Sequence, residues 1–532
     1  MSRLRRLRRF SWLWLVLLPV VPVLGLRVTG AIGDTPTIPL NDLNTALGVI
    51  PGYPTPAAAP EQLNPEPSYA ASPRAVCGPG SHPLAGVQGR VPASAINSPQ
   101  AKDGWTCNLS VVGHYSSSGG FKVWHYTDQH GHLCAFYDTT LLYPMDALSL
   151  TGPPSSGVYV LDMTNSAHPV LTDKLTELPM LSPHESLYLN PKRGLLAADL
   201  GNPGSYPGLM SIYDVSQDCR HPVLDATYRA SRFGHESAFS PDGRTFWVTG
   251  GGEGIAAVDV SDPKNPHTLW EGNEYSHGGS ISDDGNRFYA ADSLDGNLTT
   301  LDVSQIQARK PNPQVREVSR LTWQRVTIPQ NSAPMIIHGH RYLLEFDEFA
   351  FRFDTVTPAD TVGAARIIDM ADETHPRVVS NLRLEVNNPE YRAQADSDPG
   401  GIGGNNPQVG YAAHYCAIPR EVDPEIVACS FINSGLRIFN IQDPRHPREV
   451  AYFVSPPKAS NANGNQASDT AMSKPEFYPA RSEVWYSDAA SGFWAVHLDK
   501  SAWPQGAPAA KPHKRQHHRR HHRRHRRRHW PR

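Results

Sequence analysis

Residues Ile255–Pro266 read IAAVDVSDPKNP, a short apolar strand that ends at Asp259 and is followed by a turn with two prolines. The same pattern recurs along the chain, and a His-Pro or Asn-Pro step follows several of the copies. The other copies are Val158–Asp162, Met210–Asp214, Leu298–Asp302, Ala365–Asp369, Leu436–Asn440 and a degenerate seventh, Phe493–His497. Most copies lie 43 to 57 residues apart, with two intervals near 70. This period is typical of propeller blades.

A β-hairpin signal precedes the recurring strand. Asp242-Gly243 separates two apolar runs in the third repeat, and Asp284-Gly285 does so in the fourth. Asp-Gly between apolar runs is the strongest local signal for a hairpin, and the body lacks long helical periodicity. The sequence therefore predicts an all-β fold, a β-propeller of seven blades with four antiparallel strands each. We expect the strands near Cys107 to lie against the seventh unit near Trp494 and close the ring.

The amino-acid sequence of the repeats resembles that of a known family. The run VDVSDPKNP at 258–266 is similar to the consensus of the LVIVD-repeat family of exported β-propeller proteins, and Leu436–Pro447 is a further match. The resemblance covers roughly residues 107–498 and is specific because it repeats. It implies a propeller and export, but no particular chemistry.

The two ends differ from the body. Residues 1–31 combine five arginines within the first nine residues, an uncharged apolar run and, after Arg27, small residues, as in a secretory signal peptide; an uncleaved membrane anchor is the alternative. Residues 32–76 are rich in Pro and Ala and predict a disordered linker. Residues 77–500 form the repeat body, and residues 501–532 form a linker and a His/Arg-rich tail that we expect to be disordered.

Charge and cysteines limit location and partners. Residues 10–510 hold 33 basic and 51 acidic residues, a net charge of −18, so the body is not expected to bind nucleic acid. The tail carries 11 Lys/Arg and no acid, so it either solubilises the chain or anchors it to an anionic envelope polymer or lipid surface. Six cysteines suit an oxidising compartment. Folding about the turn near Val422-Asp423 places Cys416 opposite Cys429, which predicts one disulfide; the pairing of the other four stays open.

Four histidines open the first strand of their repeats. They are His184, His235, His277 and His414. Since the first strands run the same way around one channel, a repeated position becomes a ring. We expect the equivalent positions of the other repeats near Val123, Ser332 and Ser473. Four imidazoles at one level suit Fe, Cu, Zn or Ni, so the ring is a candidate site for a transition-metal ion, although the sequence favours a structural role for these histidines.

A purely structural interpretation competes with the metal site. Folding each hairpin places Asp199 opposite His184 and Asp292 opposite His277, and such pairs can simply satisfy buried polar groups. Glu185 and Glu236 follow two of the histidines, and strand alternation points them to the other face, so they are not expected to be ligands.

Two functional classes follow. One is a binding or scaffold module at the cell envelope, secreted or extracytoplasmic, that presents its propeller face to a protein or a small molecule. The other is a metal-dependent oxidoreductase with the four-histidine site at the channel. The first is favoured because no complete acid/base or nucleophile constellation occurs, and no catalytic residue is assigned.

Overall fold

The computed structural model describes most of the repeat body. The described residues are 63–64, 70–139, 157–201, 208–250, 254–274, 276–291, 298–323, 329–348, 363–395, 398–399, 410–459 and 467–504. The predicted signal segment, nearly all of the first linker and the His/Arg-rich tail lie outside them, as do all but four residues of the range 501–532.

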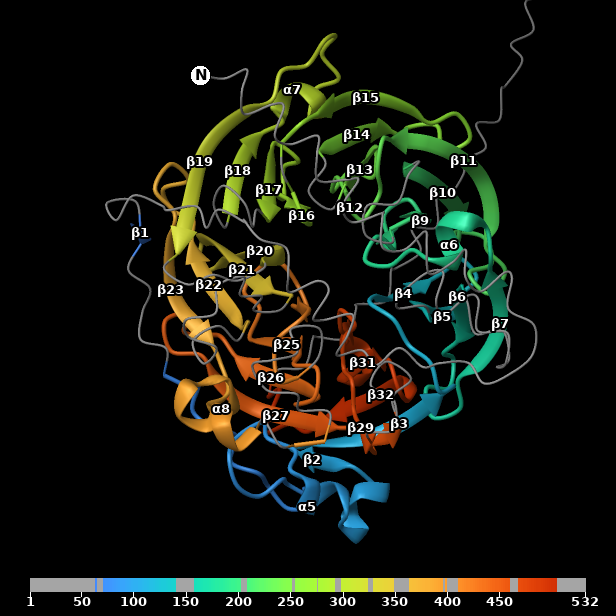
Figure 1. Ribbon diagram of the computed structural model, residues 1–532. Helices are drawn as coiled ribbons and strands as arrows, with labels where there is room; N and C mark the ends of the chain where they lie inside the picture. The colour runs from blue at the N-terminus through green and yellow to red at the C-terminus, as the bar shows by residue number, and fades with distance from the viewer. Residues whose placement is uncertain are drawn as a thin grey trace, which may run out of the picture. The chain divides into compact units, whose positions relative to one another are not determined.

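Seven antiparallel sheets are arranged radially around one axis (Figure 1), which confirms the predicted seven-bladed propeller. Each blade has four strands that follow one another from the axis outward, and in the seventh blade the outermost strand comes from near the N-terminus. Blades one to three are β4 (Val123–Thr127), β5 (Leu133–Asp138), β6 (Val158–Asp162), β7 (Val170–Leu175); β8 (Tyr188–Asn190), β9 (Leu195–Asp199), β10 (Gly208–Asp214), β11 (Val223–Ser231); and β12 (Glu236–Phe239), β13 (Thr245–Thr249), β14 (Ile255–Asp259), β15 (His267–Gly272).

The remaining blades continue this order. Blades four to seven are β16 (Gly279–Ile281), β17 (Arg287–Ala291), β18 (Leu298–Asp302), β19 (Arg316–Trp323); β20 (Pro329–Ile337), β21 (His340–Asp347), β22 (Ala365–Asp369), β23 (Arg377–Leu382); β24 (Cys416–Ala417), β25 (Ile426–Ser430), β26 (Leu436–Asn440), β27 (Arg448–Val454); and β30 (Glu476–Tyr478), β31 (Glu483–Asp488), β32 (Gly492–Leu498), β3 (Leu109–Tyr115). The recurring sequence motif is therefore the third strand of every blade.

The ring closes through β3, which is the fourth strand of the last blade. It pairs antiparallel with β32, and His114 lies opposite Trp494. The expected closure near Trp494 is thus confirmed, although Cys107 itself lies in β2 (Trp105–Cys107), which pairs with β27 of blade six. A ring closed in this way joins the two ends of the repeat body and leaves no open blade edge between the first and last blades.

A local hydrogen bond explains the recurring acidic residue at the end of the third strand. The side chains of Asp162, Asp214 and Asp259 each accept the backbone N–H of the residue two positions later, at 2.7 to 2.8 Å. Asp302 and Asn440 do the same at 3.0 and 3.2 Å. This turn directs the chain toward the fourth strand, so the motif forms the connection between the third and fourth strands of the blade.

The apolar core lies between neighbouring blades. Phe136 and Val160 of blade one pack with Leu196 and Tyr213 of blade two. On its other side, blade one packs against blade seven through Trp485. Each blade is therefore stabilised by its neighbours, as expected for a repeat fold.

Several short elements cover the outer parts of the ring. β1 (Leu63–Asn64) pairs parallel with β19, and β28 (Lys458–Ala459) and β29 (Ala467–Ser468) form a separate two-stranded antiparallel sheet. The helices are α5 (Ala93–Ile96), α6 (Leu178–Leu181), α7 (Ser304–Gln307), α8 (Pro389–Ala395), and the 3₁₀ turns η2 (Pro99–Lys102), η4 (Glu385–Asn387) and η5 (Pro479–Arg481). Of the helices in the described residues, none has the length and apolar character needed to span a membrane.

Three disulfides join the cysteines. Cys416 and Cys429 face each other across β24 and β25, as predicted, and are bonded. The pairs left open by the sequence are Cys77–Cys107 and Cys134–Cys219. Three disulfides are consistent with an extracellular location.

Candidate metal site at the propeller axis

The four predicted histidines converge at one end of the axis. His235 directly precedes β12, whereas His277 and His414 lie two residues before β16 and β24. His184 precedes β8 and adopts a left-handed backbone conformation with φ of 51°. The rings of His184, His235 and His277 follow one another with centroids 5.0 and 4.9 Å apart. All four side chains are buried.

The δ nitrogens of three histidines face backbone carbonyl oxygens. Nδ1 of His235 lies 2.9 Å from the Gly201 oxygen, and Nδ1 of His277 lies 2.9 Å from the Pro329 oxygen. Nδ1 of His414 contacts the Met472 oxygen in the same way. A carbonyl oxygen only accepts, so each Nδ1 carries a proton and donates it, and Nε2 is left to bind a ligand. Metal-binding histidines are typically oriented by such a hydrogen bond.

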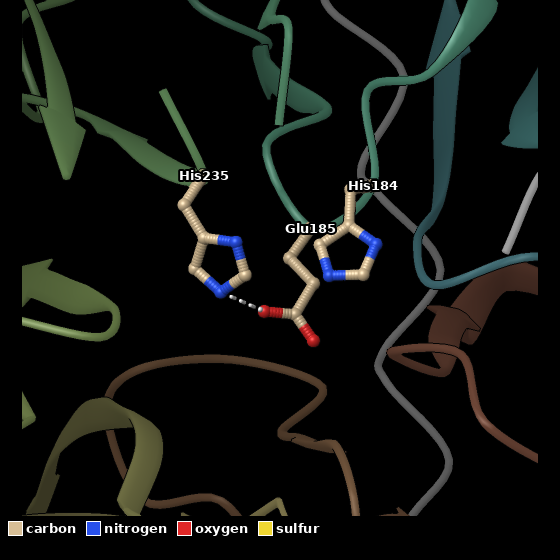
Figure 2. Close-up of side chains that lie close together, drawn as sticks. All are labelled: His184, Glu185 and His235. Atoms are coloured by element: carbon tan, nitrogen blue, oxygen red, sulfur yellow. Dashed lines mark ion pairs between the residues drawn. The ribbon is translucent and has the colours of Figure 1, made fainter. Parts of the chain in front are cut away.

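The carboxylate of Glu185 lies where the ε nitrogens meet. Its Oε2 is 3.1 Å from Nε2 of His235 and 3.4 Å from Nε2 of His277, and its Oε1 is 3.5 Å from Nε2 of His414. The ligand atoms of His184, Glu185 and His235 all lie within 4.8 Å of one another, and Figure 2 shows Glu185 between the two rings. Atoms that each lie about 2.1 Å from one ion, with bond angles near 90–110°, are about 3.0 to 3.4 Å apart. The three distances from Nε2 atoms to the Glu185 oxygens, 3.1, 3.4 and 3.5 Å, are close to this range.

Glu185 corrects the sequence-based expectation, which excluded it as a ligand. The exclusion assumed strand alternation, but His184 and Glu185 precede β8 and the left-handed His184 changes the direction of the chain. Alternation applies only within regular strand. Glu236 does begin a strand, and its carboxylate binds Nζ of Lys122 at 2.7 Å.

The electrostatics of the cluster depend on the imidazoles. Burial raises the pKa of Glu185, but the four histidines outweigh this effect and hold the pKa well below its usual range. Burial lowers the pKa of His277, but the hydrogen bond to Glu185 outweighs it and, with the charge of Glu348, raises the pKa to about 9. The site therefore strongly favours a positive charge beside Glu185, which either imidazolium protons or a metal ion can supply.

Side chains from blades one and five lie at the level of the histidines. The Phe121 ring lies 4.3 Å from His184 and 5.4 Å from His414, between centroids. The amide of Gln330 donates to Glu185 at 2.7 Å. The expected positions near Val123 and Ser332 are therefore wrong by two residues: Val123 lies in the interblade core, and the Ser332 hydroxyl bonds to Ser280. A register shift near Pro329 displaces the start of β20.

The competing His–Asp interpretation does not hold for His184. Asp199 lies opposite Ser186 instead, whose hydroxyl contacts the backbone N–H and oxygen of Asp199. The register of β8 and β9, with Tyr188 opposite Ala197, places the pair two residues from the expected position. Asp292 lies outside the described residues.

Two further groups of possible ligands were missed by the sequence analysis. Glu348 follows β21 and its Oε2 lies 3.5 Å from Nε2 of His277; nothing in the repeat pattern marks it. Asp128, His132 and Asp218 also lie together at the rim. There, Asp128 accepts three backbone N–H groups and Arg220 binds Asp218 at 2.8 Å, so this second group is already satisfied by the protein.

Comparisons with known proteins add little to this site. No family model matches the chain, and no curated protein sequence matches it. Among solved structures, hydrazine synthase of Kuenenia stuttgartiensis has a TM-score of 0.43 at 11% identity, covering 73% of this chain and 98% of that one. The β-propeller domain of Cps50 (Swd1) from Myceliophteria thermophila has a TM-score of 0.44 at 13% identity, with the same shares of 73% and 98%. A putative 6-phosphogluconolactonase from Bacteroides fragilis has a TM-score of 0.40 at 10% identity, covering 66% and 93%. Since these TM-scores and identities are low, we base no functional inference on them.

Proposed function

We propose that the chain is an exported β-propeller whose axis binds one transition-metal ion, with His184, His235, His277, His414 and Glu185 as ligands. One observation carries the proposal. Three ε nitrogens converge on a single buried carboxylate, at 3.1 to 3.5 Å, while the matching δ nitrogens face backbone carbonyls. Carboxylate oxygens and the Nε2 lone pairs of neutral imidazoles repel each other, so a positive charge must lie between them. Either protons on the imidazoles or a metal ion can supply it, and the metal ion is the proposal.

The donor set indicates the kind of ion. Four imidazole nitrogens and one carboxylate suit Fe, Cu, Zn or Ni. All six cysteines are in disulfides, so no thiolate competes for the ion. The ordinary role of such a propeller is that of a binding module at the cell envelope. The LVIVD resemblance, the signal-like N-terminus and the three disulfides support this location.

A metal-dependent oxidoreductase is the second candidate. Five protein ligands leave one position of an octahedral ion for a small molecule. The apolar ring of Phe121 lies beside two of the histidines, 4.3 and 5.4 Å from their centroids, and offers no donor that could take this position.

Metal analysis of the full chain tests the proposal. A histidine-rich tail can itself bind metal ions, so the measured quantity is the difference between the wild type and His235→Ala after dialysis against a weak chelator. We expect the wild type to retain one ion per chain more than the variant. His375→Ala is the matched control, because His375 is exposed and pairs only with neighbouring residues of its own turn. Equal metal content in the wild type and His235→Ala would refute the proposal.

A further inference from the structure

A second buried charge cluster lies directly beside the histidine site. We define the Glu236 cluster as Glu236, Lys122, Asn331 and Tyr415, each of which follows a residue at the level of the histidines. Nζ of Lys122 lies 2.7 Å from Oε1 of Glu236. The side chains are 3% and 0% exposed, so water does not screen this ion pair.

The four members of the cluster come from different blades. The other three meet on one carboxylate oxygen of Glu236. The Asn331 amide and the Tyr415 hydroxyl donate to the same Oε1 at 2.7 and 3.2 Å. Lys122 also lies over the Tyr415 ring, 4.0 Å from its centroid. A buried ion pair is costly to desolvate and adds little to stability over an apolar core. Two apolar side chains of similar volume would stabilise the fold equally well. The ion pair therefore indicates a role beyond packing.

Hydrogen bonds link this cluster to the metal site. The amide nitrogen of Gln330 donates both to Glu185 at 2.7 Å and to the Tyr415 hydroxyl at 2.8 Å. The Tyr415 hydroxyl therefore accepts from Gln330 and gives its own proton to Glu236. Tyr415 also packs edge-on against His414, with centroids 4.7 Å apart. The charges of the Glu236 cluster thus act on the histidine site at short range, through buried and weakly polarisable surroundings.

The proposed ion would be surrounded by more anions if Lys122 were absent. Glu185 lies among the ligands, Glu348 lies 3.5 Å from His277, and Glu236 is the third carboxylate nearby. Lys122 cancels the charge of Glu236. An uncancelled buried anion stabilises the higher oxidation state of a nearby ion, because that state carries one more positive charge.

We propose that Lys122 is a positioning residue that sets the reduction potential of an iron or copper ion at the histidine site, by cancelling Glu236 and thereby favouring the reduced ion. This inference rests on the proposed function. The step concerned is a one-electron reduction: the oxidised ion takes one electron from an added reductant, and no bond forms or breaks and no proton moves. The propeller then holds a redox-active ion, and the charges of Glu236 and Lys122 set the reduction potential of that ion.

The test uses the full chain loaded with Cu(II), titrated with ascorbate and followed by the electron paramagnetic resonance signal of Cu(II). Signal from the tail is removed by subtracting the same titration of His235→Ala. In Lys122→Met we expect the ratio of Cu(I) to Cu(II) at a fixed solution potential to fall by about tenfold or more, as an uncancelled buried charge requires. Lys122→Arg and the double variant Lys122→Met/Glu236→Gln keep the charge balance and should stay near the wild type. Lys264→Met is the surface control, since Lys264 is 72% exposed.

A second variant keeps the inference falsifiable if Lys122→Met does not fold. Glu236→Gln removes the anion and leaves the ammonium, so the ratio should rise instead of fall. Opposite shifts in the two single variants support the inference. Copper bound with an unchanged ratio in Glu236→Gln overturns the inference and leaves the metal site intact. No copper at the wild-type site overturns the inference for copper, and no ion of any kind in the metal analysis overturns the proposed function itself.

Discussion

Two clusters of buried carboxylates in this propeller are neutralised by different groups. In blade five, Arg366 binds Glu345 at 2.7 Å and Asp347 at 2.9 Å. Its guanidinium also stacks on Trp323, 4.2 Å from the ring centroid. At the axis, Glu185 lies among four imidazoles.

The difference lies in the cation. Arginine is always charged, so the blade five cluster carries its own counter-ion and is complete without a ligand. Imidazole changes its charge near neutral pH and coordinates metals when neutral. The axial cluster therefore depends on protons or an ion supplied from outside. A permanent cation identifies a structural cluster, whereas a cluster of imidazoles around an anion is suited to binding a ligand.

The largest expected effect comes from removing the permanent cation. Arg366→Met should lower the free energy of unfolding by about 3–5 kcal/mol, because it removes the guanidinium that lies between two buried carboxylates. Denaturant unfolding measures this loss. A triple variant that also carries Glu345→Gln and Asp347→Asn should lose much less. An equal loss in the triple variant would show that packing, and not charge, maintains this cluster.

The axial cluster should respond to metal where the blade five cluster does not. At an ion concentration about 100 times the dissociation constant, binding adds about 2.7 kcal/mol to the unfolding free energy. We expect this gain in the wild type and in the blade five triple variant, and a clearly smaller gain in Glu185→Gln at the same concentration. Thermal melts with and without Zn²⁺ measure it. An unchanged gain in Glu185→Gln would remove this residue from the ligand set.

Asp138 is a buried carboxyl with neither arginine nor histidine, and its stability contribution should depend on pH. It accepts the N–H groups of Phe121 and Lys122 at 2.9 and 2.8 Å. Burial raises its pKa to about 7, against these hydrogen bonds. The folded pKa is above the unfolded one, so its stabilising effect is present below pH ~4 and is lost as pH rises toward ~7, by at most about 1.4 kcal/mol per pH unit.

Asp138→Asn should remove that part of the pH dependence. Urea unfolding at pH 4.5, 5.5 and 6.5 compares the two proteins, and the difference between them should change steadily across the series. Parallel curves would mean that Asp138 is already ionised in the folded protein.

The smallest effect is expected at an exposed pair. Arg316 binds Asp302 at 2.6 Å, but the arginine side chain is 72% exposed. Arg316→Gln should therefore cost less than about 1 kcal/mol. Burial raises the pKa of Asp302, but hydrogen bonds from Ser304 and Arg316 outweigh it and lower the pKa to about 2. The folded pKa is below the unfolded one, so the pair's contribution is lost as pH falls from ~4 to ~2; a loss comparable to that of Arg366→Met would contradict this ranking.

The sequence predicted most of the fold and four of the five proposed ligands. The four histidines share one repeat position, and the ring symmetry alone brings them together. Glu185 was missed because the chain before β8 is not regular strand. Gln330 was missed because the repeat register shifts near Pro329, and Glu348 was missed because it follows β21, where nothing in the repeat pattern marks it.

What the sequence determined by itself is local. The third strands, the Asp-Gly hairpins and the Cys416–Cys429 bond all depend on residues within one repeat. Because these residues are close together in the sequence, their periodicity and turn residues are enough to predict the structure. Only the tertiary structure decided the Cys134–Cys219 bond, the closure by β3 (His114 opposite Trp494), and the contact of Lys122 with Glu236, whose partners are 85, 380 and 114 residues apart. Such contacts depend on how seven blades close around one axis, and that closure is set by packing between blades, which no single repeat encodes.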